Sequence, residues 1–92
     1  MITSNKLEII YCKKCNWLTR SSWMAQELLT TFSEELSELS LIPGSGGIFE
    51  IRVNKDLIWS LKENGRFPDI KELKILVRDQ IAPDKSLGHT ER

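Results

Sequence analysis

The stretch Ile9-Ile10-Tyr11-Cys12-Lys13-Lys14-Cys15-Asn16-Trp17 decides how this chain is expected to fold. It starts as an apolar strand, continues through Cys-x-x-Cys, and ends where an amphipathic helix is expected to begin. Cys12 and Cys15 are the only cysteines of the chain. A pair at this spacing, beside a strand–helix–strand pattern, is typical of a dithiol redox motif.

The residues around the two sulfurs favour ionised thiols. A cysteine at a helix N-terminus faces unpaired N–H groups and the positive end of the helix dipole, and both stabilise a thiolate. Lys13 and Lys14 add positive charge between the sulfurs. Because Cys12 precedes the helix, we expect it to be the more exposed sulfur and the nucleophile. Cys15, in the first helical turn, would then be the resolving thiol.

Composition narrows the class of protein. Ninety-two residues make one small domain, and 13 Lys and Arg balance 13 Asp and Glu, so no basic field points to nucleic acid. No apolar run approaches the roughly 18 residues of a spanning helix, and the N-terminus lacks the apolar region of a signal peptide. We therefore expect no nucleic-acid or membrane partner and a cytoplasmic location, where the cysteines are kept reduced between turnovers.

Hydrophobic periodicity predicts the order β-α-β-β-β-α. Strands are expected at 6–11, 38–42, 48–53 and 57–61, and helices at 16–32 and 70–81. A helical connection between the first two strands favours parallel pairing, whereas the turn at 54–56 predicts an antiparallel hairpin. The expected fold is α/β in the broad sense, an α+β two-layer structure with a four-stranded mixed sheet and two helices on one face.

The last helix has clear limits in the sequence. Asp69 with Glu72 three residues later predicts a capping box, and Pro83 ends the helix. We therefore expect a single domain at 1–83, followed by a polar tail at 84–92 in which Leu87 is the only apolar residue.

Four segments carry a family resemblance. They are Tyr11-Cys12-Lys13-Lys14-Cys15, Gly47-Ile48-Phe49-Glu50-Ile51, Lys62-Glu63-Asn64-Gly65-Arg66-Phe67-Pro68-Asp69 and Ser86-Leu87-Gly88-His89. Together they resemble the selenoprotein W, T and H group, the thioredoxin-like Rdx family, in its bacterial branch with two cysteines. The resemblance implies a thiol redox protein of cell redox homeostasis, linked in animal relatives to glutathione and to protein partners. It implies no organic or metal cofactor.

The resemblance also bears on the roles of the two cysteines. The selenoproteins carry selenocysteine at the second motif position, which corresponds to Cys15, so the resemblance leaves Cys15 open as the primary nucleophile. Sulfur in place of selenium implies a weaker nucleophile at neutral pH. Thioredoxins proper place a cis-proline just before the strand that faces the active site, where this chain has Gly46 and Gly47.

Cys12 and Cys15 have an alternative interpretation as half of a zinc site. Zinc usually takes four ligands, and the chain has no second cysteine pair, so only His89 could add another nitrogen. A zinc site shared by two chains remains the open alternative to redox chemistry.

The glycine-rich segment Pro43-Gly44-Ser45-Gly46-Gly47 also has two interpretations. A phosphate-binding loop is disfavoured, because a strand follows it and no helix N-terminus does. A turn with positive φ is expected instead. If it lies beside the cysteines, Gly46 and Gly47 would let a substrate approach closely.

Trp23 lies on the polar side of the first helix and predicts either of two surfaces. With Ile75 it would form a partner-binding or dimer surface, whereas Leu87 folding back over it would cover it. The alternative function is accordingly a redox-sensitive adaptor module that binds a protein through Trp23 without turning over substrate.

Overall fold

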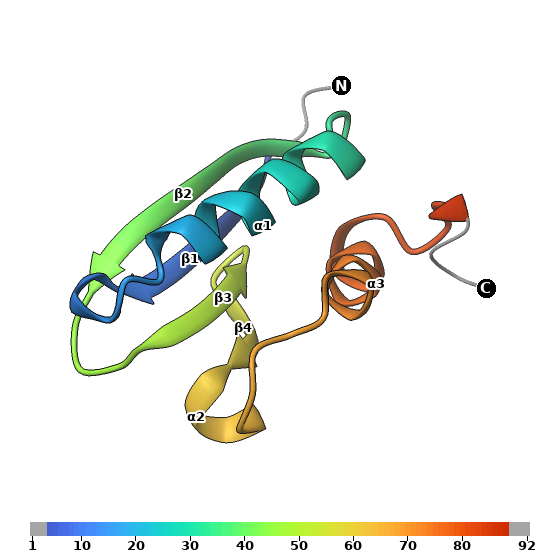
Figure 1. The fold of residues 1–92 in the computed structure, drawn as a ribbon. Coiled ribbons are helices and arrows are strands. Elements are labelled where there is room, and N and C mark those ends of the chain that lie inside the picture. Colours follow the sequence, from blue (N-terminus) through green and yellow to red (C-terminus); the bar gives the residue numbers. More distant parts are fainter. Residues whose placement is uncertain (1–3, 89–92) are drawn as a thin grey trace.

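The computed structural model describes residues 4–88, which form a single sheet covered by helices (Figure 1). The strands are β1 (Asn5–Cys12), β2 (Leu36–Gly44), β3 (Phe49–Val53) and β4 (Asp56–Ser60), and the helices are α1 (Leu18–Thr31), α2 (Leu61–Asn64) and α3 (Ile70–Ile81). The sheet order is β2-β1-β3-β4, with β1 parallel to β2 and the other pairs antiparallel. The predicted four-stranded mixed sheet is therefore confirmed.

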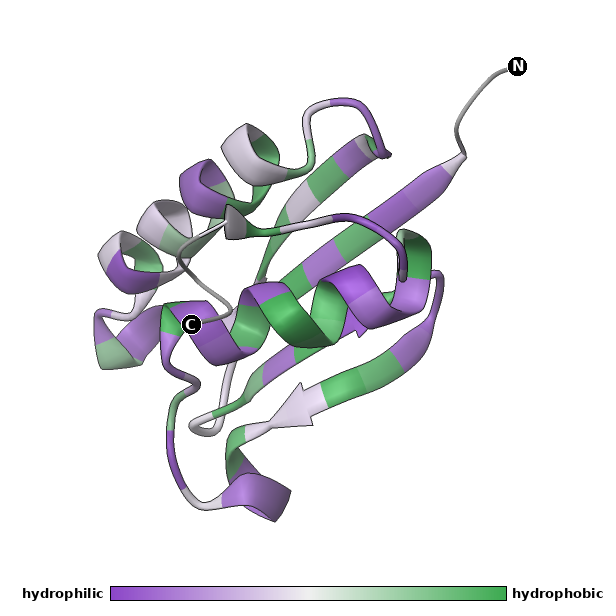
Figure 2. Cartoon of the chain, turned by 90° about the vertical axis from the view of Figure 1, so that its right-hand side faces the viewer, coloured by the Kyte–Doolittle hydropathy of each residue, from purple (hydrophilic) through white to green (hydrophobic). Residues whose placement is uncertain are grey.

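The core lies between the sheet and the helices. Alternate residues of β1 and β3 point into it, and hydrophobic and hydrophilic residues alternate along the strands (Figure 2). The buried strand residues are Leu7, Ile9, Tyr11, Phe49, Ile51 and Val53. Each such burial contributes about 1.5–3 kcal/mol, so this alternation sets which face of the sheet the helices cover.

Helix α1 covers β1 and β2 and packs beside α3. Its buried residues are Ser21, Met24, Ala25 and Leu28, as the helical spacing predicts. Leu18, the first residue of the helix, is 50% exposed although the same spacing places it on the buried side. The Lys74 Nζ–Glu27 Oε1 ion pair, 2.9 Å long, joins α3 to α1.

One helix was missed in the sequence. Residues 61–64, expected as the end of a strand and a polar connection, form α2. Ser60 caps it by accepting a hydrogen bond from the N–H of Glu63, and Gly65 ends it with φ of 75°. The Ser-x-x-Glu spacing followed by glycine was a signal that could have found this helix.

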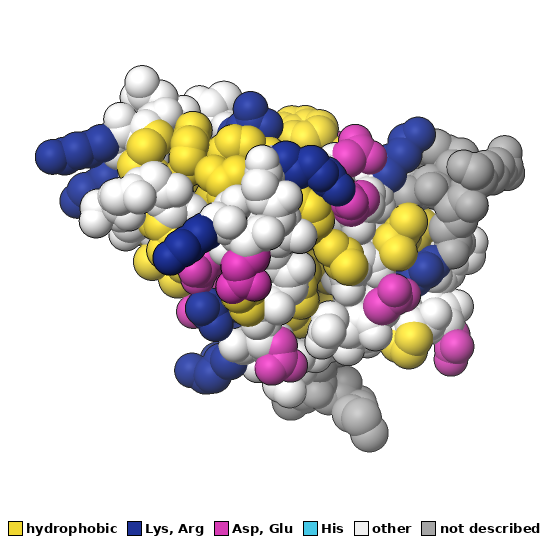
Figure 3. All heavy atoms as spheres, turned by 90° about the horizontal axis from the view of Figure 1, so that it is seen from below, with side chains coloured by type: hydrophobic (Ala, Val, Ile, Leu, Met, Phe, Trp, Pro, Cys, Tyr) yellow, Lys and Arg dark blue, Asp and Glu magenta, His cyan; other side chains and the backbone are white. Residues whose placement is uncertain are grey.

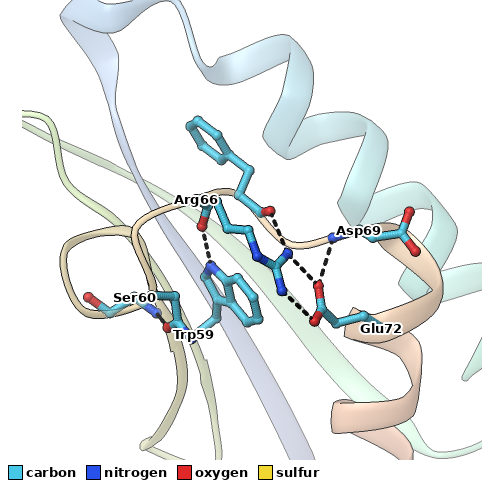
Figure 4. Close-up of polar contacts among 7 residues, drawn as sticks. Trp59, Ser60, Arg66, Asp69 and Glu72 are labelled. Carbon is cyan, nitrogen blue, oxygen red and sulfur yellow. Dashed lines mark hydrogen bonds and ion pairs between the residues drawn. The ribbon is translucent and has the colours of Figure 1, made fainter.

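Arg66 joins the segment after α2 to the start of α3 (Figure 4). Its two terminal nitrogens each donate to a different carboxylate oxygen of Glu72 at 2.8 Å, and its guanidinium lies 5.0 Å from the ring centroid of Trp59. Trp59 Nε1 donates to the carbonyl of Arg66 at 2.9 Å. The predicted Asp69–Glu72 capping box is also present. The segment between α2 and α3 is therefore held in place through hydrogen bonds of both its side chains and its backbone.

The tail is partly attached to the body of the protein. Leu87 packs against the core, and Lys85 Nζ pairs with Glu35 Oε2 at 3.1 Å. His89 and the remaining tail positions lie outside the described residues. Within residues 4–88, no helix is both long and apolar enough to cross a membrane.

The Arg66–Glu72 pair makes the stability of the protein depend on pH in the acidic range. Hydrogen bonds from Arg66, and then from the Asp69 N–H, lower the pKa of Glu72 to about 2 from its ordinary value of 4.5. Between these two pH values the unfolded chain binds the extra proton, so we expect the free energy of unfolding to fall as pH is lowered from about 4.5 towards 2.

Glu72→Gln should flatten this pH dependence while lowering stability at pH 7. Urea unfolding at several pH values measures both effects, with Glu63→Gln in α2 as the matched control. If the free energy of unfolding of Glu72→Gln changed with pH as steeply as that of the unmodified protein, the assignment of this pH dependence to Glu72 would be contradicted.

Candidate functional site

The two cysteines are joined by a disulfide at the end of β1, one of the two inner strands of the sheet. Cys12 is the last residue of β1, and Cys15 ends the three-residue 3-10 turn η1 (Lys13–Cys15), with the two Cα atoms 5.4 Å apart. The carboxyl ends of strands in open α/β sheets are where ligands generally bind. The pair thus lies where a substrate could reach it.

The backbone after Cys15 differs from the expected helix start. Asn16 has φ of 62° and ψ of 35°, a left-handed conformation that a right-handed helix cannot contain. Consequently α1 begins at Leu18 and not at 16, and Cys15 lies in the turn before the helix rather than in its first turn. Asparagine is one of the few non-glycine residues that adopt this conformation readily, which was a weak signal in the sequence.

The expectation that Cys12 is the more exposed cysteine is wrong. Cys12 is 2% exposed, whereas Cys15 is half-buried. The reason is the sheet order, which gives β1 a neighbour on each side. Cys12 lies opposite Gly44 of β2, and the preceding Tyr11 lies opposite Phe49 of β3. The accessible residue of the pair is therefore Cys15.

The glycine-rich loop lies beside the cysteines, between β2 and β3. A Cβ atom on Gly44, the last residue of β2, would come within 2.7 Å of Ile48 Cγ2, so a glycine is required at this position. Gly46 and Gly47 are exposed and have φ of 71° and 77°. They form a turn that leads into β3, as the sequence predicted.

An aromatic cluster that sequence reasoning missed supports the cysteine segment. The ring of Phe67 makes edge-on contacts with Trp17 and Phe49, with centroids 5.0 and 4.9 Å apart. The Arg20 guanidinium lies 4.2 Å from the Phe67 ring centroid. The cluster joins the segment before α3 to the residues that follow Cys15, and such pairs each contribute about 0.5–1.5 kcal/mol beyond area burial.

A groove of about 410 Å³ opens at the same end of the sheet. Its lining residues are Gly46, Gly47, Ile48, Phe49, Glu50, Ser60, Leu61 and Lys62. The two flanking lysines of the disulfide, Lys13 and Lys14, are exposed. The site therefore combines a disulfide, a glycine-rich loop and several exposed lysines.

The two residues predicted to form a partner-binding surface, Trp23 and Ile75, differ in exposure. Trp23 is 48% exposed on α1, while Ile75 is half-buried. Among residues 4–88, no group of three or more His, Cys, Asp or Glu side chains is arranged to hold a metal ion.

The fold and the site define a thioredoxin-like protein with a Cys-x-x-Cys pair at the end of its first strand. The chain belongs to the Rdx family, whose family model matches residues 6–79. The resemblance seen in the sequence is thus confirmed.

Solved structures agree with this assignment. A selenoprotein W-related protein from Vibrio cholerae is 50% identical, with a TM-score of 0.82 over 85% of this chain and 98% of that one. A protein from Bordetella parapertussis is 47% identical, with a TM-score of 0.82 over 84% of this chain and 98% of that one. No curated protein sequence matches the chain significantly. Family and disulfide together support a redox-type role.

Asn16 offers a test of the turn that separates Cys15 from α1. Asn16→Ala should lower the free energy of unfolding by about 1 kcal/mol relative to Asn16→Gly, because a Cβ without a local hydrogen-bonding group disfavours the left-handed conformation. Urea unfolding of both oxidised variants measures the difference. Equal stabilities would show that the left-handed turn places no constraint on this segment.

Proposed function

We propose that this protein is a thiol–disulfide oxidoreductase that cycles Cys12 and Cys15 between dithiol and disulfide. The observation that carries the proposal is the disulfide at the carboxyl end of β1, with Cys15 accessible and Cys12 buried. Membership of the Rdx family supports the same chemistry.

Reduction of a substrate disulfide would take two exchanges. The Cys15 thiolate attacks one substrate sulfur, forming a mixed disulfide while the other substrate sulfur leaves with the bonding electron pair and takes up a proton. The Cys12 thiolate then attacks the Cys15 sulfur, and the first substrate sulfur leaves as a thiol. Two electrons and two protons pass to the substrate, and Cys12 and Cys15 become a disulfide.

Burial supports this division of roles. An attacking thiolate needs access to its substrate, and Cys15 is the more accessible residue of the pair. Cys12 needs to reach only Cys15, whose Cα is 5.4 Å away, so its attack is intramolecular and fast. Lys13 and Lys14 lie beside the attacking sulfur in the chain and favour its ionised form. This assignment replaces the expected order, in which Cys12 attacks.

The proposed cycle requires a thiol reductant. We propose glutathione or a second thioredoxin-like protein as the donor, and the cytoplasm as the location, because its thiol pool would return the disulfide to the dithiol. The cellular role would then be redox homeostasis. Protein disulfides, or glutathione itself, would be the exchange partners.

Serine variants distinguish the two cysteine roles. Cys12→Ser should accumulate a mixed disulfide on Cys15, since the resolving thiol is gone. Cys15→Ser should slow disulfide reduction by at least about 100-fold, since the nucleophile is gone. Mass spectrometry and the rate of peptide disulfide reduction measure the two outcomes. A mixed disulfide that accumulates on Cys12 of the Cys15→Ser variant would reverse the roles.

The reduction potential tests the proposal as a whole. Equilibration in glutathione buffers should give a reversible Cys12–Cys15 couple between roughly −180 and −300 mV, the range of working dithiol proteins. If only single glutathione adducts form and the internal disulfide does not, the dithiol cycle is wrong.

A second function, as a redox-sensitive adaptor, is favoured by Trp23. Its side chain is 48% exposed on α1, and exposed tryptophan is enriched among residues that dominate protein interfaces. A concentration-dependent mass that Trp23→Ala abolishes would support a dimer through this surface. A mass that does not change with concentration in the unmodified protein would argue against it.

A further inference from the structure

Charge is unevenly placed in this neutral chain. Ion pairs in the described part of the molecule include Lys6–Glu38, Arg52–Glu50, Arg66–Glu72, Lys74–Glu27, Arg78–Asp79 and Lys85–Glu35. Lys13 and Lys14 of η1 and Lys62 of α2 have no carboxylate partner among residues 4–88. The net charge of zero therefore does not describe the disulfide end.

These three lysines lie on two segments, η1 and α2, at the same end of the sheet. Lys13 and Lys14 are exposed in the turn that contains Cys15, and Lys62 lines the groove together with Gly46 and Gly47. The turn between β1 and α1 forms the left-hand end of the molecule in Figure 1. Seen from below in Figure 3, Lys or Arg side chains project from that end, beside hydrophobic side chains and without a visible Asp or Glu.

Few carboxylates oppose these cations locally. Glu50 lines the groove, but its Oε1 pairs with Arg52 at 3.0 Å. Glu63 is the exposed acidic neighbour of Lys62 in α2. In the segments that hold these lysines and the glycines, residues 13–15, 44–48 and 61–64, three lysines accompany one acidic residue, so the charge of these segments is positive.

The groove that Lys62 lines suits an extended peptide. Its apolar lining includes Ile48 and Leu61, and nothing lies within 4 Å of the position that a Cβ would take on Gly46 or Gly47. A peptide backbone can therefore approach the loop closely beside the disulfide. Its side chains would then lie within the field of the lysines.

We propose that this end of the molecule selects protein disulfides flanked by acidic residues. The inference rests on the proposed oxidoreductase function and names its substrate class. Asp or Glu beside the substrate cysteine would be attracted by the lysines over about 8–10 Å at moderate salt, raising the encounter rate and the concentration near Cys15. Basic flanks would be repelled, so the cations act mainly on substrate choice.

The test compares three synthetic peptides with the same internal disulfide and Asp, Lys or neutral flanks. The reduced full-length protein should react about tenfold faster with the Asp peptide than with the Lys peptide at low salt, and this ratio should approach one at high salt. Using the ratio, with the neutral peptide as reference, separates substrate choice from any change in the reactivity of the thiolate itself.

Lysine variants locate the effect. The triple variant Lys13→Gln, Lys14→Gln and Lys62→Gln should bring the ratio close to one. Lys55→Gln is the matched control, because Lys55 is exposed in the β3–β4 turn at the opposite end of the sheet, where Val53 pairs with Leu7. This control should keep the full preference.

The outcomes separate the two proposals. Equal rates with the acidic and basic peptides would overturn the acidic preference and leave the oxidoreductase function standing. A preference that survives in the triple variant would overturn its assignment to these lysines. Exchange with none of the peptides would overturn the oxidoreductase proposal itself.

Discussion

The structure depends on the pairing of β1 with a strand on each side. Its hydrogen bonds to β2 and β3 hold the middle of the sheet, and Leu7 and Ile9 supply completely buried side chains beneath the helices. Backbone pairing on both edges leaves β1 little freedom to move. Cys12, as its last residue, is therefore held rigidly and away from solvent.

The site combines this rigid cysteine with a more accessible one. Cys15 lies in a three-residue turn, and the left-handed Asn16 separates that turn from α1. Thiol–disulfide exchange requires one sulfur that a partner can reach and another that stays close behind it. A strand end followed by a short turn supplies both, and Phe67 packs on Trp17 to steady the chain just beyond.

Surface charge adds a property that the net charge hides. Several carboxylates of the sheet and helices are taken up by ion pairs, as Glu72 is by Arg66 and Glu27 is by Lys74. The lysines nearest the disulfide are left without such partners in the described residues. Because exposed charges interact over roughly a Debye length, this arrangement affects encounters with other molecules more than it affects stability.

The sequence by itself determined the strand order along the chain, the alternating core of β1 and β3, the capping box at Asp69 and the position of the Cys-x-x-Cys motif. These follow from local periodicity and from residue types acting within a few positions. Only the tertiary structure decided that Cys12 is buried, that Phe67 meets Trp17 and Phe49, and that Lys62 lines a groove beside Gly46. Each of these depends on which strands become neighbours, and burial at a strand's end is a property of the completed sheet.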